Sequence, residues 1–331
     1  VFVHRPDLIR RRLTQTNHDD LLFDDVLCVD KAEEEHDAFV EMMRARGIEV
    51  FCVHELLAEA MVAAKPEFKQ RYVNRIINEY TVGWALVDEL RAYAMSLDPA
   101  SLARHVIGGL TKGEAKLDWG ALSKVSALAA ASGEDDFILP PLPNTLFTRD
   151  SSCWMYNGVS INPMYWPVRR LEAVNMAAIY RTHPLFDGAD FEYWYPLRGD
   201  DQRLEAADFG QASLEGGDVM PIGNKTVLIG MSERSTGRMI EQVAKNLFAK
   251  EAAERVIACV MTKDRAHMHL DTVFTMLDVD AVTIYPKVVN NITAYSIRPG
   301  NKEGGFEVTQ EESFLGAVAD ALNVKELRVV P

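Results

Sequence analysis

The fold is indicated most clearly by residues 153–162, which read CWMYNGVSIN. Two strand-like runs flank Asn157-Gly158, a dipeptide favoured in two-residue hairpin turns because both central residues need a positive φ. A helix is expected from about Pro167, since its apolar residues recur on one face, and residues 191–195 return to strand character. This segment therefore predicts a unit of strand, tight turn, strand, helix and strand.

Similar units are expected at residues 214–260, 269–330 and, more loosely, 21–53, which makes about four units in all. The last copy along the chain has a longer middle loop than the others. The strand segments expected in these copies are 21–29, 49–53, 214–220, 226–229, 255–260, 272–277, 281–285 and 327–330, with hairpin turns at 223–224 and 278–280 and helices at 31–46, 235–249 and 310–322.

Residues 56–133 interrupt the repeats. They are rich in Ala, Leu, Glu and Lys and have almost no strand pattern, which predicts an all-helical insertion. We therefore expect a first unit at 1–55 that is incomplete at its N-terminus, the insertion at 56–133, and further units at 134–331. A doubly wound parallel sheet is the commoner arrangement of alternating strands and helices, but the hairpins demand antiparallel pairs. An α/β fold with units arranged radially, as in a propeller, is favoured.

The composition argues against several classes of protein. With 48% hydrophobic and 25% charged residues, the 331-residue chain is predicted to be globular rather than disordered. Its formal net charge of -14 argues against nucleic acid as a partner, and no apolar run is long enough to span a membrane. The four cysteines are widely spaced, which suits the reducing cytoplasm better than a disulfide framework. The sequence is compatible with a homo-oligomer.

Unusual polar residues come directly before the first strand of three units, in segments 144–150, 214–218 and 267–271. In a ring of repeated blades, equivalent ends converge on the central axis, so the three segments are expected to meet although they are distant in sequence. The reactive side chains that they carry are Asp150, Glu215, His269 and Asp271.

Each of these segments also has a structural interpretation when it is taken singly. Asp150 is placed where an acid closes a turn, and residues 215–218 suit a tight loop with a solvated acid. His269 can be a hydrogen-bonded structural histidine, and for His267 this interpretation is preferred. The coincidence of three equivalent positions favours a functional site.

A pocket with several carboxylates suits a cationic ligand. Neighbouring carboxylates raise one another's pKa unless a positive charge compensates them, and a guanidinium supplies that charge. Its planar fork of N–H donors matches carboxylates bidentately, so two acids, for which Asp150 and Asp271 are the candidates, can fix both of its edges. His269 is the candidate proton carrier for a departing amine, and a nearby Glu215 would favour its protonated form.

Hydrolysis of a guanidinium also needs a nucleophile, for which a cysteine thiolate is expected. Cys28, Cys52 and Cys259 lie in or at the end of apolar runs that are typical of buried cysteines. Cys153 is the nearest candidate, since it follows Asp150 by three residues. It lies on a predicted strand, however, where packing is its expected role.

A metal-dependent hydrolase is the rival interpretation. His267, His269 and Asp271 have the spacing of a metal-binding loop. Thr272 occupies the position at which a further histidine would be expected, so the metal pattern is incomplete. No metal and no cofactor is predicted.

Five longer blocks of the sequence resemble the arginine deiminase family of the pentein superfamily, and the likeness spans essentially the whole chain. Blocks of this length in this order are far more specific than a short motif. The blocks are LPPLPNTLFTRD at 139–150, NPMYWPVRR at 162–170, LEGGDVMPIGN at 214–224, GMSER at 230–234 and MHLDTVF at 268–274.

The resemblance implies a five-bladed α/β propeller with a helical insertion, which converts L-arginine and water to L-citrulline and ammonia without metal or cofactor. It implies that Asp150 and Asp271 bind the guanidinium. It also implies that His269 is the general acid and base and that Glu215 assists substrate binding and proton transfer.

The resemblance extends to the rest of the substrate. Asn144, Arg169 and Arg234 match residues that hold its α-carboxylate end, and Phe147 matches a residue that packs along its aliphatic stem. Without the resemblance, the two arginines would be interpreted as solvated charges at helix starts.

The nucleophile implied by the resemblance is a cysteine in a Gly-His-Cys segment near the family's C-terminus, which forms a covalent thiouronium adduct. The printed residues stop before such a segment and before a final blade, so we expect residues to be missing at both ends and residues 1–331 alone to be inactive. A sister amidinotransferase, a methylated-arginine hydrolase or a non-catalytic arginine-binding protein are the remaining alternatives. Residues 147–150 and 166–170 favour the deiminase.

Overall fold

The hairpin expected at residues 153–162 is present in the computed structural model, which describes residues 1–196, 211–302 and 304–330. Strands β5 (Ser152–Met155) and β6 (Gly158–Ile161) pair antiparallel. The turn centres one residue earlier than expected, because Met155 lies opposite Gly158, and Tyr156 has a φ of 53°.

Gly158 serves the packing of the sheet rather than the turn. A Cβ at this position would lie 2.7 Å from the Trp194 ring and 2.7 Å from the carbonyl oxygen of Glu192. Both residues belong to β7 (Glu192–Tyr195), which pairs with β6 in parallel. Glycine is therefore needed here because the backbone of β6 and the indole of Trp194 approach each other closely.

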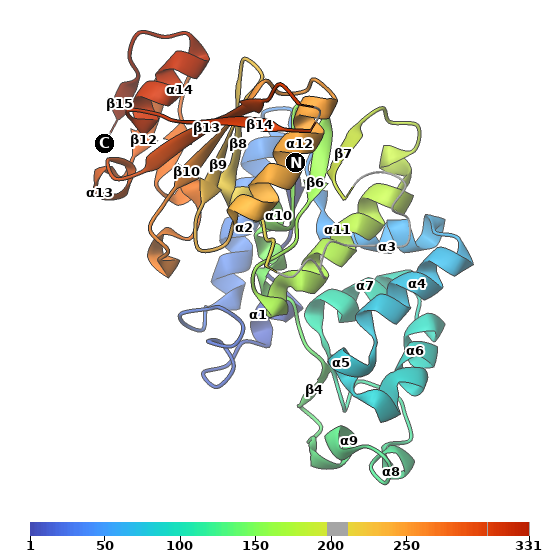
Figure 1. The fold of residues 1–331 in the computed structure, drawn as a ribbon. Coiled ribbons are helices and arrows are strands. Elements are labelled where there is room, and N and C mark those ends of the chain that lie inside the picture. Colours follow the sequence, from blue (N-terminus) through green and yellow to red (C-terminus); the bar gives the residue numbers. More distant parts are fainter. Residues whose placement is uncertain (197–210, 303, 331) are drawn as a thin grey trace. The chain divides into compact units, whose positions relative to one another are not determined.

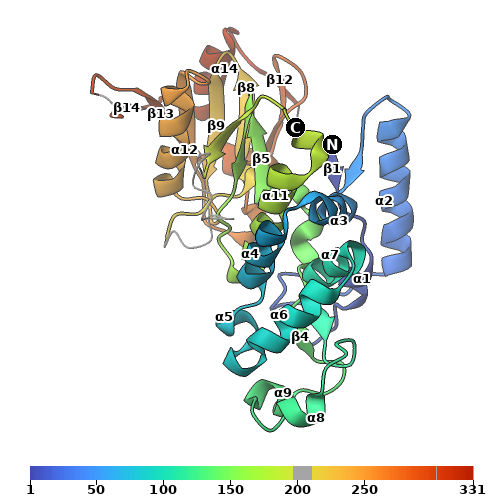
Figure 2. The same ribbon diagram turned by 90° about the vertical axis from the view of Figure 1, so that its right-hand side faces the viewer.

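The described chain divides into two compact units. The first comprises Val1–Thr148 and Val174–Ala189, and the second comprises Arg149–Ala173 and Asp190–Pro331. In the ribbon views most of the first unit is coloured blue to green and most of the second is yellow to red (Figures 1 and 2).

The second unit contains three copies of a ββαβ topology. In each copy the first two strands pair antiparallel, and the third strand joins the second in parallel. Besides β5, β6 and β7, the strands are β8 (Val219–Gly223), β9 (Thr226–Met231), β10 (Arg255–Val260), β11 (Phe274–Met276), β12 (Ala281–Ile284) and β15 (Arg328–Val330). The connecting helices are α11 (Arg170–Thr182), whose residues from Val174 belong to the first unit, α12 (Gly237–Ala249) and α14 (Phe314–Leu322).

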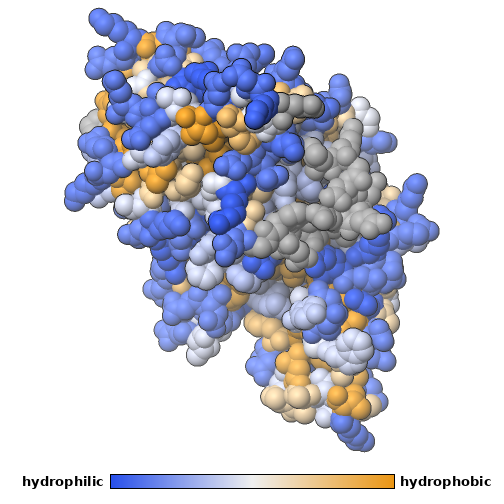
Figure 3. All heavy atoms as spheres, viewed as in Figure 1, coloured by the Kyte–Doolittle hydropathy of each residue, from blue (hydrophilic) through white to orange (hydrophobic). Residues whose placement is uncertain are grey.

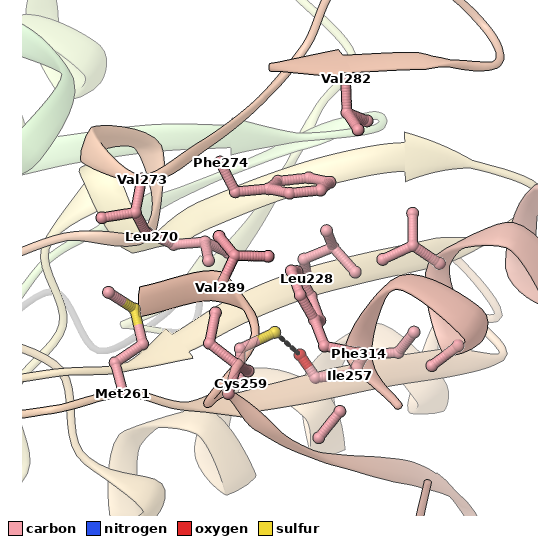
Figure 4. Packing of buried hydrophobic residues seen from close by; sticks show 14 of the residues in the cluster. Leu228, Ile257, Cys259, Met261, Leu270, Val273, Phe274, Val282, Val289 and Phe314 are labelled. Carbon is pink, nitrogen blue, oxygen red and sulfur yellow. Dashed lines mark hydrogen bonds between the residues drawn. The ribbon is translucent and has the colours of Figure 1, made fainter. Parts of the chain in front are cut away.

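Strands β9 and β10 are buried on both faces, which explains their almost continuous apolar sequence. Successive side chains point to opposite faces of a sheet. Val227 and Val256 pack with the residues of α12, which lies across this sheet in Figure 1. Leu228 and Ile257 pack on the other face with Phe274 and residues of α14 (Figure 4).

The long middle loop of the last copy contains a hairpin that was not expected. Strands β13 (Thr293–Pro299) and β14 (Phe306–Gln310) pair antiparallel, and β13 pairs with β10. The resulting sheet has the strand order β14-β13-β10-β9-β8. The expectation of a helix from Gln310 is wrong at its start, because that residue ends β14 and the helix is capped by Ser313.

The looser copy at residues 21–53 is only partly present. Helix α2 (Val29–Arg44) and β2 (Phe51–Cys52) form, and β2 pairs in parallel with β1 (Phe2–Val3). The strand expected at 21–29 is wrong, since this segment forms turns and coil before α2. Phe23, an apolar residue of this segment, lies under the guanidinium of Arg10. The central carbon of the guanidinium, Cζ, is 3.9 Å from the centroid of the Phe23 ring.

Helices dominate the region expected to be a helical insertion. One short strand, β3 (Leu110–Thr111), was not expected there; it pairs antiparallel with β4 (Phe137–Leu139), which follows the region. The helices of the first unit outside α2 and α11 are α1 (Leu8–Arg11), α3 (Val53–Ala63), α4 (Pro66–Ile76), α5 (Glu79–Val82), α6 (Val87–Ser96), α7 (Pro99–Gly108), α8 (Trp119–Leu122) and α9 (Ala127–Ala131).

The fold is therefore a mixed α/β fold, in which the strands of the described residues form separate open sheets. No helix among the described residues combines the length and apolar character needed to cross a bilayer. Hydrophilic residues cover much of the face shown in Figure 3, and hydrophobic ones are confined to smaller groups.

Candidate active site

Three short turns lie just before the first strands of the ββαβ copies: one contains Asp150, and the other two begin directly after Glu215 and His269. They are α10 (Thr148–Ser151) before β5, η5 (Gly216–Asp218) before β8 and η7 (Leu270–Thr272) before β11. The structure brings Asp150, Glu215 and His269 together, with one polar atom of each within 4.8 Å of the others. The convergence expected from the sequence is thus observed for these three side chains.

Two glycines allow this close approach. A Cβ at Gly216 would lie 1.9 Å from the carbonyl oxygen of Arg149, and a Cβ at Gly217 would lie 2.5 Å from Nδ1 of His269. Neither glycine has a positive φ. Glycine is therefore needed at both positions because a Cβ would collide with neighbouring atoms, and not because of the backbone conformation. The Gly-Gly pair therefore lets η5 fit between the Asp150 turn and the histidine ring.

Guanidinium groups already lie against the clustered carboxylates. Arg169 donates through Nη1 to Oδ2 of Asp150 at 2.8 Å and to Oε2 of Glu215 at 3.4 Å. Arg234 donates through Nη1 to the same Glu215 oxygen at 3.2 Å. Both arginines are 2% exposed, so the interpretation of them as solvated charges does not hold.

Arg169 has a further partner in Glu172, one helical turn later. Its Nε and Nη2 donate to the two carboxylate oxygens of Glu172 at 3.0 and 2.9 Å. Burial raises the pKa of Glu172 to about 7, although the guanidinium acts to lower it. A forked pair of this kind fixes the orientation of the arginine as well as neutralising its charge.

His269 is held between two acids. Its Nε2 lies 2.9 Å from Oε2 of Glu215, and its Nδ1 lies 3.8 Å from Oδ1 of Asp150. Burial acts to lower the pKa of His269, but the hydrogen bond with Glu215 and the charges of Asp150, Asp218 and Glu215 outweigh it and raise the pKa to about 9. The imidazole is therefore protonated at neutral pH.

Glu215 is fully buried and remains ionised. Burial acts to raise its pKa, yet the hydrogen bond from His269 and the charges of Arg169, His269 and Arg234 lower it on balance. Three cationic groups thus share one carboxylate, and its negative charge favours the protonated imidazole.

Asp271 lies in the same region but outside this cluster. Its side chain is 35% exposed, and its carboxylate is 4.0 Å from Nε of Arg149. Burial raises the pKa of Asp271, with Asp150 acting in the same direction and His269 and Arg149 opposing it. Arg149 is otherwise engaged with the backbone, since it donates to the carbonyl oxygens of Gly216 and Val219.

Two of the residues matched to substrate binding belong to the first unit. Asn144 is buried there and donates through Nδ2 to the carbonyl oxygen of Leu21 at 2.8 Å. Phe147 is 47% exposed. The second unit, which contains the carboxylate cluster, includes neither of them.

The metal-binding loop of the rival interpretation does not form a set of ligands in the described part of the chain. Among the described residues, His267 and Asp271 do not belong to any group of three acids, histidines or cysteines with ligating atoms close enough for one ion, and the ring of His267 packs near Tyr285 instead. Asp150, Glu215 and His269 do form such a group. In this structure the guanidinium of Arg169 lies against two of its carboxylates, so a metal ion bound there would need Arg169 to move away.

The cysteines of the second unit are poor nucleophiles. Burial raises the pKa of Cys153 to about 11, and the residue packs in the core beside Asn162, as expected. Burial also raises the pKa of Cys259 far above its ordinary value, and Figure 4 shows its side chain in the core with its sulfur directed at the carbonyl of Ile257. Cys28 and Cys52 belong to the first unit.

Sequence reasoning missed two buried acids in this region. Glu172 follows Arg169 by three residues on a helix, a spacing that allows ion pairs and could have revealed it. A tight loop with a solvated acid was one of two interpretations of residues 215–218, and Asp218 was given no role of its own, yet it is 0% exposed. Its burial could not be deduced from a Gly-Gly-Asp sequence, since the same residues are common in open turns.

The site is thus one in which buried carboxylates bind guanidinium groups beside a protonated histidine. Residues 19–331 match the arginine deiminase family. The chain therefore belongs to the arginine deiminase family, which consists of hydrolases that act on guanidino groups.

Several solved structures are similar to parts of the chain. A dimethylarginine dimethylaminohydrolase, solved as an adduct with 4-chloro-2-hydroxymethylpyridine, matches with a TM-score of 0.30 and 22% identity over 44% of this chain and 50% of that one. The apo structure of ArgZ, an arginine dihydrolase from the ornithine-ammonia cycle in cyanobacteria, matches with a TM-score of 0.32 and 22% identity over 44% of this chain and 19% of that one.

A third similar structure is the dimethylarginine dimethylaminohydrolase from Pseudomonas aeruginosa, in complex with citrulline. Its TM-score is 0.32 and its identity 17%, over 58% of this chain and 71% of that one. The chain therefore spans half or less of the length of the first two structures and 71% of the length of the third.

Proposed function

We propose that the protein hydrolyses the guanidinium group of L-arginine to L-citrulline and ammonia. The observation that carries this proposal is the cluster of Asp150, Glu215 and His269, in which the carboxylates already bind two guanidinium groups of the chain itself. A site in which carboxylates bind planar cations next to a protonated imidazole supplies the acids and the proton donor of guanidinium hydrolysis, though not its nucleophile. The proposal includes the five-bladed arrangement of ββαβ units and a cytoplasmic location.

Asp150 and Asp271 are the proposed partners of the substrate's guanidinium. Asp271 is partly exposed and its carboxylate lies 4.0 Å from Nε of Arg149, so it is accessible to N–H donors of a ligand. Asp150 is bonded to Arg169 and to the N–H of Gly217. For Asp150 to bind substrate, Arg169 must exchange that bond.

Such an exchange would serve both ends of the substrate. Arg169 and Arg234 are proposed to receive the α-carboxylate; the roles that the resemblance implies for Asn144 and Phe147 stay predictions. If Arg169 turns to the substrate's carboxylate, Asp150 loses one guanidinium and gains another. The charge of the buried site is then unchanged, so that binding does not leave an acid unpaired.

The proposed reaction proceeds through a cysteine nucleophile from outside the printed residues. Its thiolate attacks the guanidinium carbon, and His269 donates a proton to the departing nitrogen, which leaves as ammonia. Water then attacks the thiouronium carbon and gives up one proton to His269. As the carbonyl forms, the second water proton passes to solvent, where ammonia takes it up as ammonium, and citrulline leaves with the thiolate restored. A histidine with a pKa of about 9 begins this cycle in its protonated form at neutral pH, as the first step requires.

The test is product analysis with the full-length protein. We expect citrulline and ammonia in equal amounts from L-arginine, and no citrulline from a His269→Ala variant. A preference for methylated arginine would identify a methylarginine hydrolase, and transfer to glycine an amidinotransferase. Heat of arginine binding without citrulline would indicate a binding protein, and activity that disappears on chelation and returns with zinc or iron would indicate a metal-dependent enzyme. Each of these outcomes would contradict the proposal.

A further inference from the structure

Asp218 is a fully buried acid beside the cluster that has no part in the proposed reaction. Its Oδ2 accepts hydrogen bonds from the hydroxyls of Ser232 at 2.7 Å and Ser235 at 2.6 Å. Its Oδ1 accepts the backbone N–H of Leu270 at 2.9 Å. The carboxylate therefore links η5 to the loop that carries Arg234 and to the turn that carries His269.

The two serines extend this link to the backbone of the site. Ser232 Oγ accepts the N–H groups of Arg234 at 3.0 Å and of Ser235 at 3.3 Å. Ser235 Oγ accepts the N–H of Glu215 at 3.1 Å. Through two hydroxyls, one carboxylate thus holds the backbone positions of Glu215 and Arg234, and it bonds directly to the backbone of Leu270, the residue after His269.

The directions of these hydrogen bonds assign a charge to Asp218. A hydroxyl has one proton and two lone pairs, and both lone pairs of Ser232 are used by N–H groups, so its proton points to Asp218. The N–H of Leu270 can only donate. A carboxyl group surrounded by donors in this way is stabilised in its ionised form.

The absence of a side chain at Gly230 leaves space for the Asp218 carboxylate. A Cβ at Gly230 on β9 would lie 2.1 Å from Oδ1 of Asp218. A Cβ at Gly217, the neighbouring residue, would collide with His269. A side chain at position 230 would therefore occupy the space of the Asp218 carboxylate.

Asp218 and His269 stabilise each other's charges. Burial raises the pKa of Asp218 to about 7, whereas the charge of His269 and the bonds from Ser235, Ser232 and Leu270 act to lower it. In turn, the charge of Asp218 is among the causes that raise the pKa of His269.

We propose that Asp218 is a positioning residue, which as a buried carboxylate ties the loops of Arg234 and His269 to η5 and helps to keep His269 protonated. The meaning of this role for catalysis rests on the proposed function, because Asp218 acts through His269. Its effect on the histidine is a property of the unliganded protein, so the two can be tested separately.

The test is an NMR titration of His269 in the full-length protein without substrate, assigned by comparison with His269→Gln. In Asp218→Asn, which keeps the size of the side chain but removes its charge, the pKa of His269 is expected to fall by about one unit. The control is Asp320→Asn, which removes an acid of the same unit that pairs with Arg255 at 2.7 Å, and which is expected to leave His269 unchanged. An equal effect of both variants, or none of either, would overturn the proposal.

Two further variants decide the matter if Asp218→Asn does not fold. Ser232→Ala and Ser235→Ala each remove one donor from Asp218 and favour its neutral form, so each is expected to lower the pKa of His269 by less than the loss of the acid. Titrations of both that match the wild type would refute the role.

Kinetics add a second readout: the alkaline limb of kcat should move with the pKa of His269 while KM changes less. A wild-type protein that forms no citrulline would contradict the proposed function. The NMR titration of His269 would still test the role of Asp218.

Discussion

Replacement of Glu215 by glutamine tests the electrostatic basis of the site. The residue is fully buried, its Oε2 lies 2.9 Å from Nε2 of His269, and it is the acid that bonds the imidazole most closely. The pKa of His269 stands at about 9 against an ordinary value of 6.5. At about 1.4 kcal/mol per pKa unit, this rise corresponds to roughly 3 kcal/mol in favour of the protonated ring.

Loss of the Glu215 charge should remove most of that stabilisation. An opposite charge at this distance shifts a pKa by about 1 to 3 units, so we expect the pKa of His269 to fall to about 7. At pH 8 the protonated fraction then drops from about nine tenths to about one tenth. Because protonated His269 is needed for the first proposed step, kcat at pH 8 should fall about tenfold more than kcat at pH 6.

The stability of the fold should respond with the matching sign. A histidine whose pKa is raised on folding contributes stability that is present below pH 6.5 and is lost as the pH rises through about 9. The difference in unfolding free energy between wild type and Glu215→Gln should therefore be larger at pH 6 than at pH 10. Urea titrations at the two pH values measure it.

The matched control is Glu311→Gln, which removes an acid of the second unit that pairs with Arg255 at 2.9 Å. Its pH–rate profile is expected to coincide with that of the wild type. The reasoning is refuted if Glu215→Gln folds and its alkaline limb stays where the wild type has it, since His269 would then owe its protonation to something else.

Three further variants test the surroundings of the site. Glu172→Gln takes the forked counter-charge from buried Arg169 and should lower the unfolding free energy by about 3 kcal/mol, measured in urea; a loss below about 0.5 kcal/mol, the usual range for surface pairs, would contradict this. Gly217→Ala places a methyl group 2.5 Å from Nδ1 of His269 and should reduce kcat by about 100-fold, whereas unchanged kinetics would show that the ring moves freely. Cys153→Ala should keep kcat within about threefold, because a buried thiol with a pKa of about 11 is a poor nucleophile, and complete loss of citrulline formation by a folded variant would identify Cys153 as the nucleophile.

The convergence of the site could be predicted because it follows from the repeats. Residues that occupy the same place before the first strand of equivalent units lie at equivalent ends of those units. Asp150, Glu215 and His269 obey this rule, and their side chains meet. Asp271 follows His269 by two residues in the same turn, yet its carboxylate is partly exposed and outside the trio, which sequence spacing alone does not reveal.

The partners inside the cluster could not be predicted. Arg169 and Arg234 looked like solvated charges by their positions, and their burial depends on which carboxylates the fold places beside them. Asp218 is buried because hydroxyls from a distant loop reach it. These contacts join segments far apart in the chain, and local sequence carries little information about them.

Local patterns failed where tertiary packing set the outcome. Asn157-Gly158 indicated the hairpin correctly, but the turn centres one residue earlier and the glycine is required by Trp194. Residues 306–310 alternate as a strand does, yet they were included in a long loop and in the start of a helix. Their partner β13 completes a sheet with β10, so the pairing becomes visible only in the folded chain.

The position of bound arginine tests the central claim most directly. A crystal structure of the full-length His269→Ala variant with L-arginine should show the guanidinium nitrogens within hydrogen-bonding distance of the carboxylates of Asp150 and Asp271. Arg169 should have released Asp150 in that complex. Arginine bound elsewhere, with the Arg169 to Asp150 bond intact, would contradict the account.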